Sequence, residues 1–107
     1  MTMTDLPPAI ARFIATNNAH DGDALLAVFA PGATVADDGM THSTEDAIRA
    51  WIKSHLTDPN IVLTPKSYDA GRLVASGDGD FPGGPLDFAF DFEIRDDAVT
   101  RLSIEPV

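Results

Sequence analysis

The sequence predicts an α+β fold in which helices cover one face of a curved antiparallel sheet. Up to Asn60, apolar residues recur at the spacing of amphipathic helices, and from Ile61 onward the period changes to two, as in strands. The segment Leu86–Arg95 alternates cleanly and places one apolar row on a single face, which consists of Leu86, Phe88, Phe90, Phe92 and Ile94. The helices need an apolar sheet face to cover, and we expect this row to supply it.

The composition indicates one acidic domain, residues 1–107, with a frayed tail expected at residues 1–5. The net charge of −10 argues against nucleic acid and anionic membrane surfaces as partners, because both would repel the chain. No apolar run approaches the roughly 20 residues of a membrane span, and the first residues lack the basic start of a signal peptide. The absence of cysteine excludes disulfides and thiolate chemistry and fits a cytoplasmic protein.

Two helices are expected in the first part of the chain. Pro7 and Pro8 suit the first turn of a helix, where no N–H is missed, and that helix would carry a stripe of Ile10, Phe13, Ile14 and Asn17. Asp21 is suited to cap the next helix by accepting a backbone N–H in its first turn. This second helix is expected to end at Pro31 and Gly32, after an apolar face of Leu25, Val28 and Phe29.

A short strand, a turn and a third helix follow. We expect the strand at Ala33–Ala36, the turn at Asp37–Gly39 and a further short strand at Met40–His42. Ser43 would cap the third helix, with Asp46 three residues later as in a capping box. The clearest amphipathic stripe of the chain lies on this helix, at Ile48, Trp51, Ile52 and His55.

The second half of the chain is expected to form a meander of four long strands. They lie near Ile61–Ala70, Arg72–Phe81, Leu86–Arg95 and Val99–Glu105. Short hairpin connections join the first pair and the last pair, and a tight Pro- and Gly-rich loop joins the middle pair.

Two segments, FAPGATVAD at Phe29–Asp37 and AIRAW at Ala47–Trp51, resemble the nuclear transport factor 2-like superfamily, which includes ketosteroid isomerase and SnoaL-like polyketide cyclases. The resemblance extends over about Ala9–Ile104. It implies a cone-shaped fold, in which a strongly bent sheet of about four long strands and some short ones wraps over three N-terminal helices. It also implies a pocket at the open end and, in many members, a homodimer through the outer face of the sheet.

The resemblance can be carried over to single residues. The general base of ketosteroid isomerase, at the end of the first strand, matches Asp37. Its two oxyanion donors, a tyrosine of the first helix and a protonated acid of the third long strand, fall on Phe13 and Phe90. The base position is therefore kept and both donor positions are lost. Since losing one such donor typically costs about 10²–10³ in rate, steroid isomerisation by that mechanism is not expected.

Each candidate site residue has a plainer alternative. Asp37 is either the base or an ordinary turn residue, and His42 either assists it at the pocket mouth or is a solvated loop histidine. Tyr68, the only tyrosine, would supply the missing phenol or have no role in the pocket. The remaining aromatic candidates either line a ligand pocket or pack in the core, and they are Phe13, Trp51, Phe88 and Phe90. His55 suits the C-terminal end of a helix.

Three functions remain open. The first is an enzyme of the lyase, isomerase, cyclase or hydrolase type that acts on a small hydrophobic molecule with Asp37 as base. The second is a non-catalytic pocket protein for such a molecule, and the third is a dimerisation module with a vestigial pocket. No metal site and no cofactor are expected, because the three histidines are scattered and no phosphate-binding or dinucleotide-binding motif is present.

Overall fold

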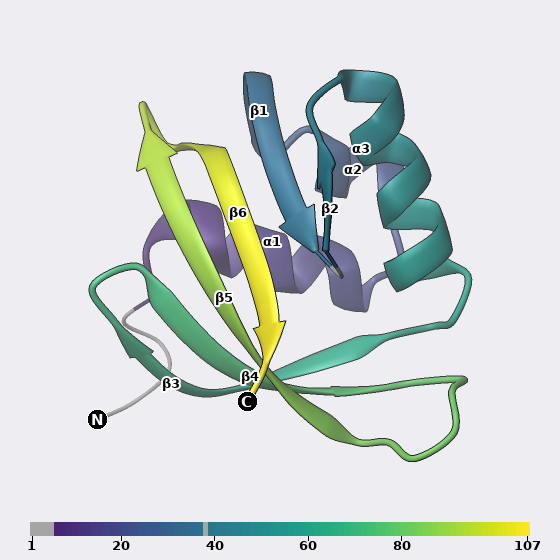
Figure 1. The fold of residues 1–107 in the computed structure, drawn as a ribbon. Helices are drawn as coiled ribbons and strands as arrows, with labels where there is room; N and C mark the ends of the chain where they lie inside the picture. The colour runs from purple at the N-terminus through teal and green to yellow at the C-terminus, as the bar shows by residue number, and fades with distance from the viewer. Residues whose placement is uncertain (1–5, 38) are drawn as a thin grey trace.

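The computed structural model describes residues 6–37 and 39–107, and its elements follow the predicted order of helices before a strand meander (Figure 1). The helical elements are α1 (Pro8–Asn18), α2 (Gly22–Leu26), α3 (Glu45–Ile52) and the π-helical turn η2 (Lys53–Thr57). The strands are β1 (Phe29–Asp37), β2 (Met40–His42), β3 (Val62–Asp69), β4 (Arg72–Asp78), β5 (Leu86–Arg95) and β6 (Ala98–Pro106). The expected frayed tail at residues 1–5 and the turn residue Asp38 lie outside the described residues.

All six strands form one bent sheet in the order β2-β1-β6-β5-β4-β3. Neighbouring strands run antiparallel except β1 and β6, which pair in parallel. Figure 1 shows α1 lying across one face behind β5 and β6, and α3 standing beside β2 at the edge. The predicted α+β class, with a strongly bent sheet over three helices, is confirmed.

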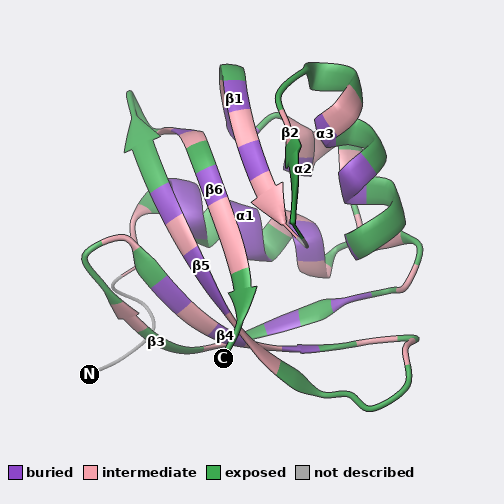
Figure 2. Ribbon diagram, viewed as in Figure 1, coloured by how far each residue is buried: buried purple, intermediate pink, exposed green. Residues whose placement is uncertain are grey.

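The core lies between α1 and the inner face of the sheet, around the ring of Phe13. Phe13 is 0% exposed. Its ring meets Phe29, Phe90 and Phe92 edge-on, with centroid distances of 6.2, 6.1 and 5.4 Å. Such edge contacts are a favoured geometry for aromatic rings, and they fix α1 against β1 and β5. Figure 2 shows buried positions along both strands, with more exposed positions between and beyond them.

The second helix ends earlier than the sequence predicts. It stops at Leu26, and the expected terminators Pro31 and Gly32 lie inside β1. Between the pairs Phe29–Val99 and Thr34–Arg101, β1 contains four residues where β6 contains one, so the register shifts there. An irregular stretch of this kind tolerates a proline without a ladder N–H and a glycine with a φ of 78°. The prediction was wrong because Pro31 and Gly32 do not only end helices. They also occur in bulged parts of strands, which is where β1 contains them.

Three further details differ from the prediction. Thr44 rather than Ser43 caps α3, since its Oγ1 accepts the N–H of Ala47 at 3.1 Å. Strand β4 ends at Asp78 instead of Phe81. The N–H of Asp80 donates to the Pro59 carbonyl at 2.7 Å instead of continuing the strand ladder. The apolar row of β5 is buried only in its middle: Leu86 and Ile94 are 45% and 36% exposed.

Ion pairs cover the outer face of the sheet. Lys66 on β3 binds Asp87 at 2.8 Å, and Arg101 on β6 lies 3.7 Å from Glu93. Arg72 on β4 reaches both Asp91 and Glu105, at 2.9 and 3.2 Å. The hydrogen bond to Glu105 is the largest single cause that raises the pKa of Arg72 above its usual value, and the charge of Asp91 is the next. The acidic row of β5 therefore finds cations within its own chain, and a partner chain is not needed to neutralise it.

Candidate functional site

A hollow of about 420 Å³ opens where the end of β1 meets η2 and the β5–β6 pair. We call it the Asp37 hollow. Its polar wall residues are Asp37, Ser54 and His55. Its apolar wall residues are Leu56, Pro59, Ile61, Leu63, Phe81, Leu86, Phe88, Phe90, Ile104 and Pro106. A mostly apolar concavity with a few converging polar groups is the usual form of a small-molecule site.

A second hollow, of about 670 Å³, lies over α2, α3 and the first half of β1. It is larger, but none of the site residues predicted from the sequence lines it. Its charged groups are already neutralised, since Arg49 binds Asp23 at 2.9 Å and lies 3.7 Å from Glu45. The Asp37 hollow is therefore the better candidate for a functional site.

Asp37 is held in the wall by a hydrogen bond from the third helix. The side chain is half-buried at the last position of β1, where its backbone pairs with Met40 of β2. The indole Nε1 of Trp51, whose residue is only 1% exposed, donates to Asp37 Oδ2 at 2.9 Å. No other side-chain hydrogen bond or ion pair to Asp37 occurs within residues 6–37 and 39–107, which leaves Oδ1 available to a ligand.

Ser54 and His55 enter the hollow from the π-helical turn. His55 Nδ1 and Ser54 Oγ lie 2.8 Å apart, so one of them donates to the other and the imidazole Nε2 remains available. The His55 ring stacks against Trp51 with a centroid distance of 6.5 Å and an interplanar angle of 27°. The same indole thus contacts His55 with its ring and Asp37 with its N–H.

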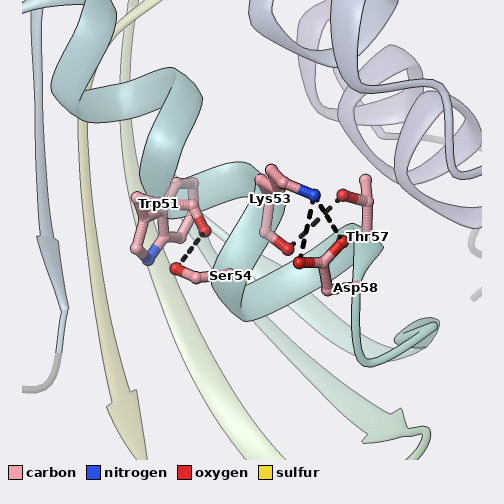
Figure 3. Close-up of polar contacts among 5 residues, drawn as sticks. All are labelled: Trp51, Lys53, Ser54, Thr57 and Asp58. Carbon is pink, nitrogen blue, oxygen red and sulfur yellow. Dashed lines mark hydrogen bonds and ion pairs between the residues drawn. The ribbon is translucent and has the colours of Figure 1, made fainter.

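The π-helical turn is itself held by local bonds, and Figure 3 shows those made by the side chains of Lys53, Ser54 and Thr57. The N–H of Asp58 donates to the carbonyl of Lys53 at 2.8 Å, five residues back along the chain. The Lys53 ammonium returns to the Asp58 carboxylate at 3.0 and 3.2 Å. Turns of this type are rare and are often found at functional sites. The sequence gives little sign of this turn, but the spacing of His55 from Trp51 places both on one helix stripe.

The structure brings together some of the predicted site residues and separates others. Phe88 and Phe90 line the Asp37 hollow with Asp37. Phe13 lies in the core behind Phe90, and Trp51 lies behind Asp37, so neither is part of the wall.

The other two predicted residues lie outside the wall. The His42 ring on β2 is 6.4 Å from that of Trp51. Tyr68 binds the β3–β4 turn, because its hydroxyl oxygen accepts a hydrogen bond from the N–H of Gly71 at 3.1 Å. It is not placed to supply a phenol to this hollow.

Comparison with known families identifies the fold. The family model that describes the SnoaL-like domain matches residues 10–102 of this chain. The chain belongs to the SnoaL-like domain family. Its α+β cone is shared with proteins of the ketosteroid isomerase-like fold, as the nuclear transport factor 2-like resemblance implied.

Solved structures support the same assignment. A putative polyketide cyclase from Sinorhizobium meliloti is 30% identical, with a TM-score of 0.87 over 98% of this chain and 100% of its own. A Mycobacterium tuberculosis protein in complex with estradiol-17beta-hemisuccinate is 15–16% identical in its two structures; the complex has a TM-score of 0.77 over 90% of this chain and 88% of its own. A ketosteroid isomerase-like protein from Catenulispora acidiphila, in complex with trimethylamine, is 22% identical, with a TM-score of 0.75 over 92% of this chain and 85% of its own. The search of curated proteins gives no match.

In the part of the chain that the structure describes, no three His, Asp or Glu side chains are grouped so as to hold a metal ion. Among the same residues, every helix is too short or too polar to cross a membrane.

Proposed function

We propose that this SnoaL-like protein binds a small hydrophobic molecule in the Asp37 hollow and that Asp37 acts there as a general base, in a lyase-, isomerase- or cyclase-type reaction. One observation carries the proposal. A carboxylate fixed by a buried indole N–H stands in the wall of an otherwise apolar hollow. A general base needs a defined position within hydrogen-bond reach of the proton it removes, and the bond from Trp51 supplies such a position.

The walls favour an apolar ligand. Three phenylalanines, Phe81, Phe88 and Phe90, belong to the apolar wall of the hollow. Each Å² of apolar ligand surface that they remove from water contributes about 25 cal/mol to binding. Asp37, Ser54 and His55 are polar groups that would orient the ligand against these walls.

Relatives lend support in the same direction. The Sinorhizobium meliloti neighbour is described as a putative polyketide cyclase, and the Mycobacterium tuberculosis neighbour binds a steroid derivative. Both are compatible with proton-transfer chemistry or binding on a hydrophobic skeleton. The fold is used for many activities, so the proposal rests on the residues of the hollow rather than on the family.

A second candidate function is binding without chemistry, and the aromatic core favours it. The two positions at which the resemblance implies oxyanion donors carry Phe13 and Phe90, whose rings donate no hydrogen bond. A base without these donors cannot stabilise an enolate in the manner of ketosteroid isomerase. A dimerisation module with a vestigial hollow is the third alternative.

The test is the variant Asp37→Asn, with Asp69→Asn as its matched control. Native mass spectrometry of the purified protein and a screen of small hydrophobic molecules would supply a ligand. We expect Asp37→Asn to keep the fold and to lower turnover by about 10²–10⁴. The exposed Asp69 at the end of β3 should tolerate the same change without effect. Turnover by Asp37→Asn at the parent rate would reject the base, and wild-type protein that binds no hydrophobic molecule would reject the whole proposal.

A further inference from the structure

The charge of Asp37 has no counter-ion within the described chain. Six of the seven lysine and arginine side chains lie 2.8–3.7 Å from carboxylates, and none of these carboxylates is Asp37. The six cations are Arg12, Arg49, Lys53, Lys66, Arg72 and Arg101. The seventh, Arg95, stands at the far end of β5 and does not line the Asp37 hollow.

Apart from Asp37, the wall of this hollow consists of apolar residues and the polar residues Ser54 and His55. No lysine or arginine belongs to its wall, as far as the chain is described, and Asp37 is its only acid. Phe81, Phe88 and Phe90 line the same space. The faces of phenyl rings attract a cation, and such contacts become stronger when water is excluded. One carboxylate oxygen is occupied by the Trp51 N–H, which leaves the other for a donor on a ligand.

The chain as a whole also favours a cation. Its net charge of −10 raises the local concentration of positive ligands and disfavours anionic ones. An anionic ligand in the hollow would face Asp37 across apolar walls, where water screens the repulsion poorly. The charge of Asp37 and the net charge of the chain therefore both favour a cationic ligand over an anionic one.

We propose that the ligand of the Asp37 hollow is a hydrophobic cation, a protonated amine or an iminium ion. Its positive nitrogen lies against Asp37 Oδ1, and its carbon skeleton lies along the rings of Phe81, Phe88 and Phe90. This inference rests on the proposed binding function of the same hollow and names the class of molecule that it takes.

A cationic substrate also explains why proton transfer here needs no oxyanion donor. When Asp37 takes a proton from the carbon next to an iminium C=N⁺, the C–H electron pair becomes a C=C bond. The C=N π pair becomes the lone pair of nitrogen, and the product is a neutral enamine beside a neutral carboxylic acid. Negative charge never develops on the substrate, so the reaction needs no hydrogen-bond donor at the positions of Phe13 and Phe90.

A matched ligand series tests the inference on the wild-type protein. The probes are 2-naphthylmethylamine, 2-naphthylmethanol and 2-naphthoate, which share a ring system and differ in charge. Titration calorimetry is done at about pH 7.5, where an alkylammonium keeps its proton. We expect the amine to bind about tenfold more tightly than the alcohol, and the naphthoate to bind most weakly.

Two variants assign the preference to a residue. Asp37→Asn should bring the amine within about twofold of the alcohol while the alcohol itself still binds, because only the charged hydrogen bond is lost. Asp69→Asn removes the same charge at an exposed site and should keep the tenfold preference. In wild-type protein, the Trp51 Nε1–H resonance should shift on adding the amine and much less on adding the alcohol, which gives a readout that does not depend on the folding of a variant.

The outcomes separate this inference from the proposed function. Equal affinity for amine and alcohol would overturn the cation inference and leave hydrophobic binding intact. If Asp37→Asn still binds the amine about tenfold more tightly than the alcohol, the preference comes from the acidic surface as a whole, and the assignment to Asp37 is overturned. Failure of all three probes to bind would count against hydrophobic binding in the hollow itself.

Discussion

The substitution Phe13→Tyr tests whether this ring belongs to the core or to a ligand pocket. It restores the hydroxyl that the ketosteroid isomerase resemblance implies at this position. In the structure, Phe13 is fully buried within an entirely apolar cluster, with three phenyl rings 5.4–6.2 Å from its own. A buried hydroxyl without a hydrogen-bond partner costs about 1–3 kcal/mol.

The assay is thermal or urea unfolding followed by fluorescence of Trp51, the only tryptophan and a buried one. We expect Phe13→Tyr to lower the free energy of unfolding by about 1–3 kcal/mol, and the melting temperature by about 4–8 °C per kcal/mol. The matched control is Phe88→Tyr, because Phe88 is half-buried in the wall of the hollow and its new hydroxyl can meet water. The control should stay within about 0.5 kcal/mol of wild type. An unchanged midpoint in Phe13→Tyr would refute the reasoning and would place this ring at the pocket end, where a tyrosine could act as donor.

Two further predictions concern the cap of α3 and the oligomer. Thr44→Ala should lower the free energy of unfolding by about 1 kcal/mol in urea titrations because it removes the Thr44–Ala47 cap bond, whereas Ser43→Ala should change it by less than about 0.5 kcal/mol. Equal effects would show that the cap bond is not formed. A homodimer through the outer face of the sheet remains a prediction, and light scattering at about 100 μM should detect it. Arg95→Glu should weaken that dimer, and a monomer in the wild type would reject it.

The fold class follows from the sequence because hydrophobic periodicity reports directly which face of an element is buried. The stripe on α3 illustrates this: Ile48, Trp51 and Ile52 are all buried, as their spacing predicts. The apolar row of β5 shows the limit of such reasoning. Periodicity predicts which side chains share a face. It does not predict how much of that face is covered, because this depends on where α1 packs. In the structure α1 packs over Phe90 and Phe92, and both ends of β5 stay exposed.

The site is less accessible to sequence reasoning, because its contacts join residues that are distant along the chain. The sequence indicates Asp37 as a base only through the resemblance, in which this position ends the first strand. Its bond to Trp51 spans 14 positions and depends on how α3 docks beside β1. The entry of Ser54 and His55 depends on a change from α-helical to π-helical winding after Ile52, which no residue type encodes locally.

The order of the strands has a consequence for how the protein is made. Strand β6 occupies an interior place in the sheet, between β1 and β5, although it is the last of the described strands to leave the ribosome. Val35 near the end of β1 pairs with Leu102 of β6, so the strand that carries Asp37 must wait for its parallel neighbour to be synthesised. Until then, the edge of β1 that faces β6 has no strand partner, and an unpaired strand edge is the kind of surface on which aggregates form. The closing of the sheet by β6 thus comes late during synthesis, and the hollow around Asp37, which Ile104 of β6 helps to line, is completed in the same step.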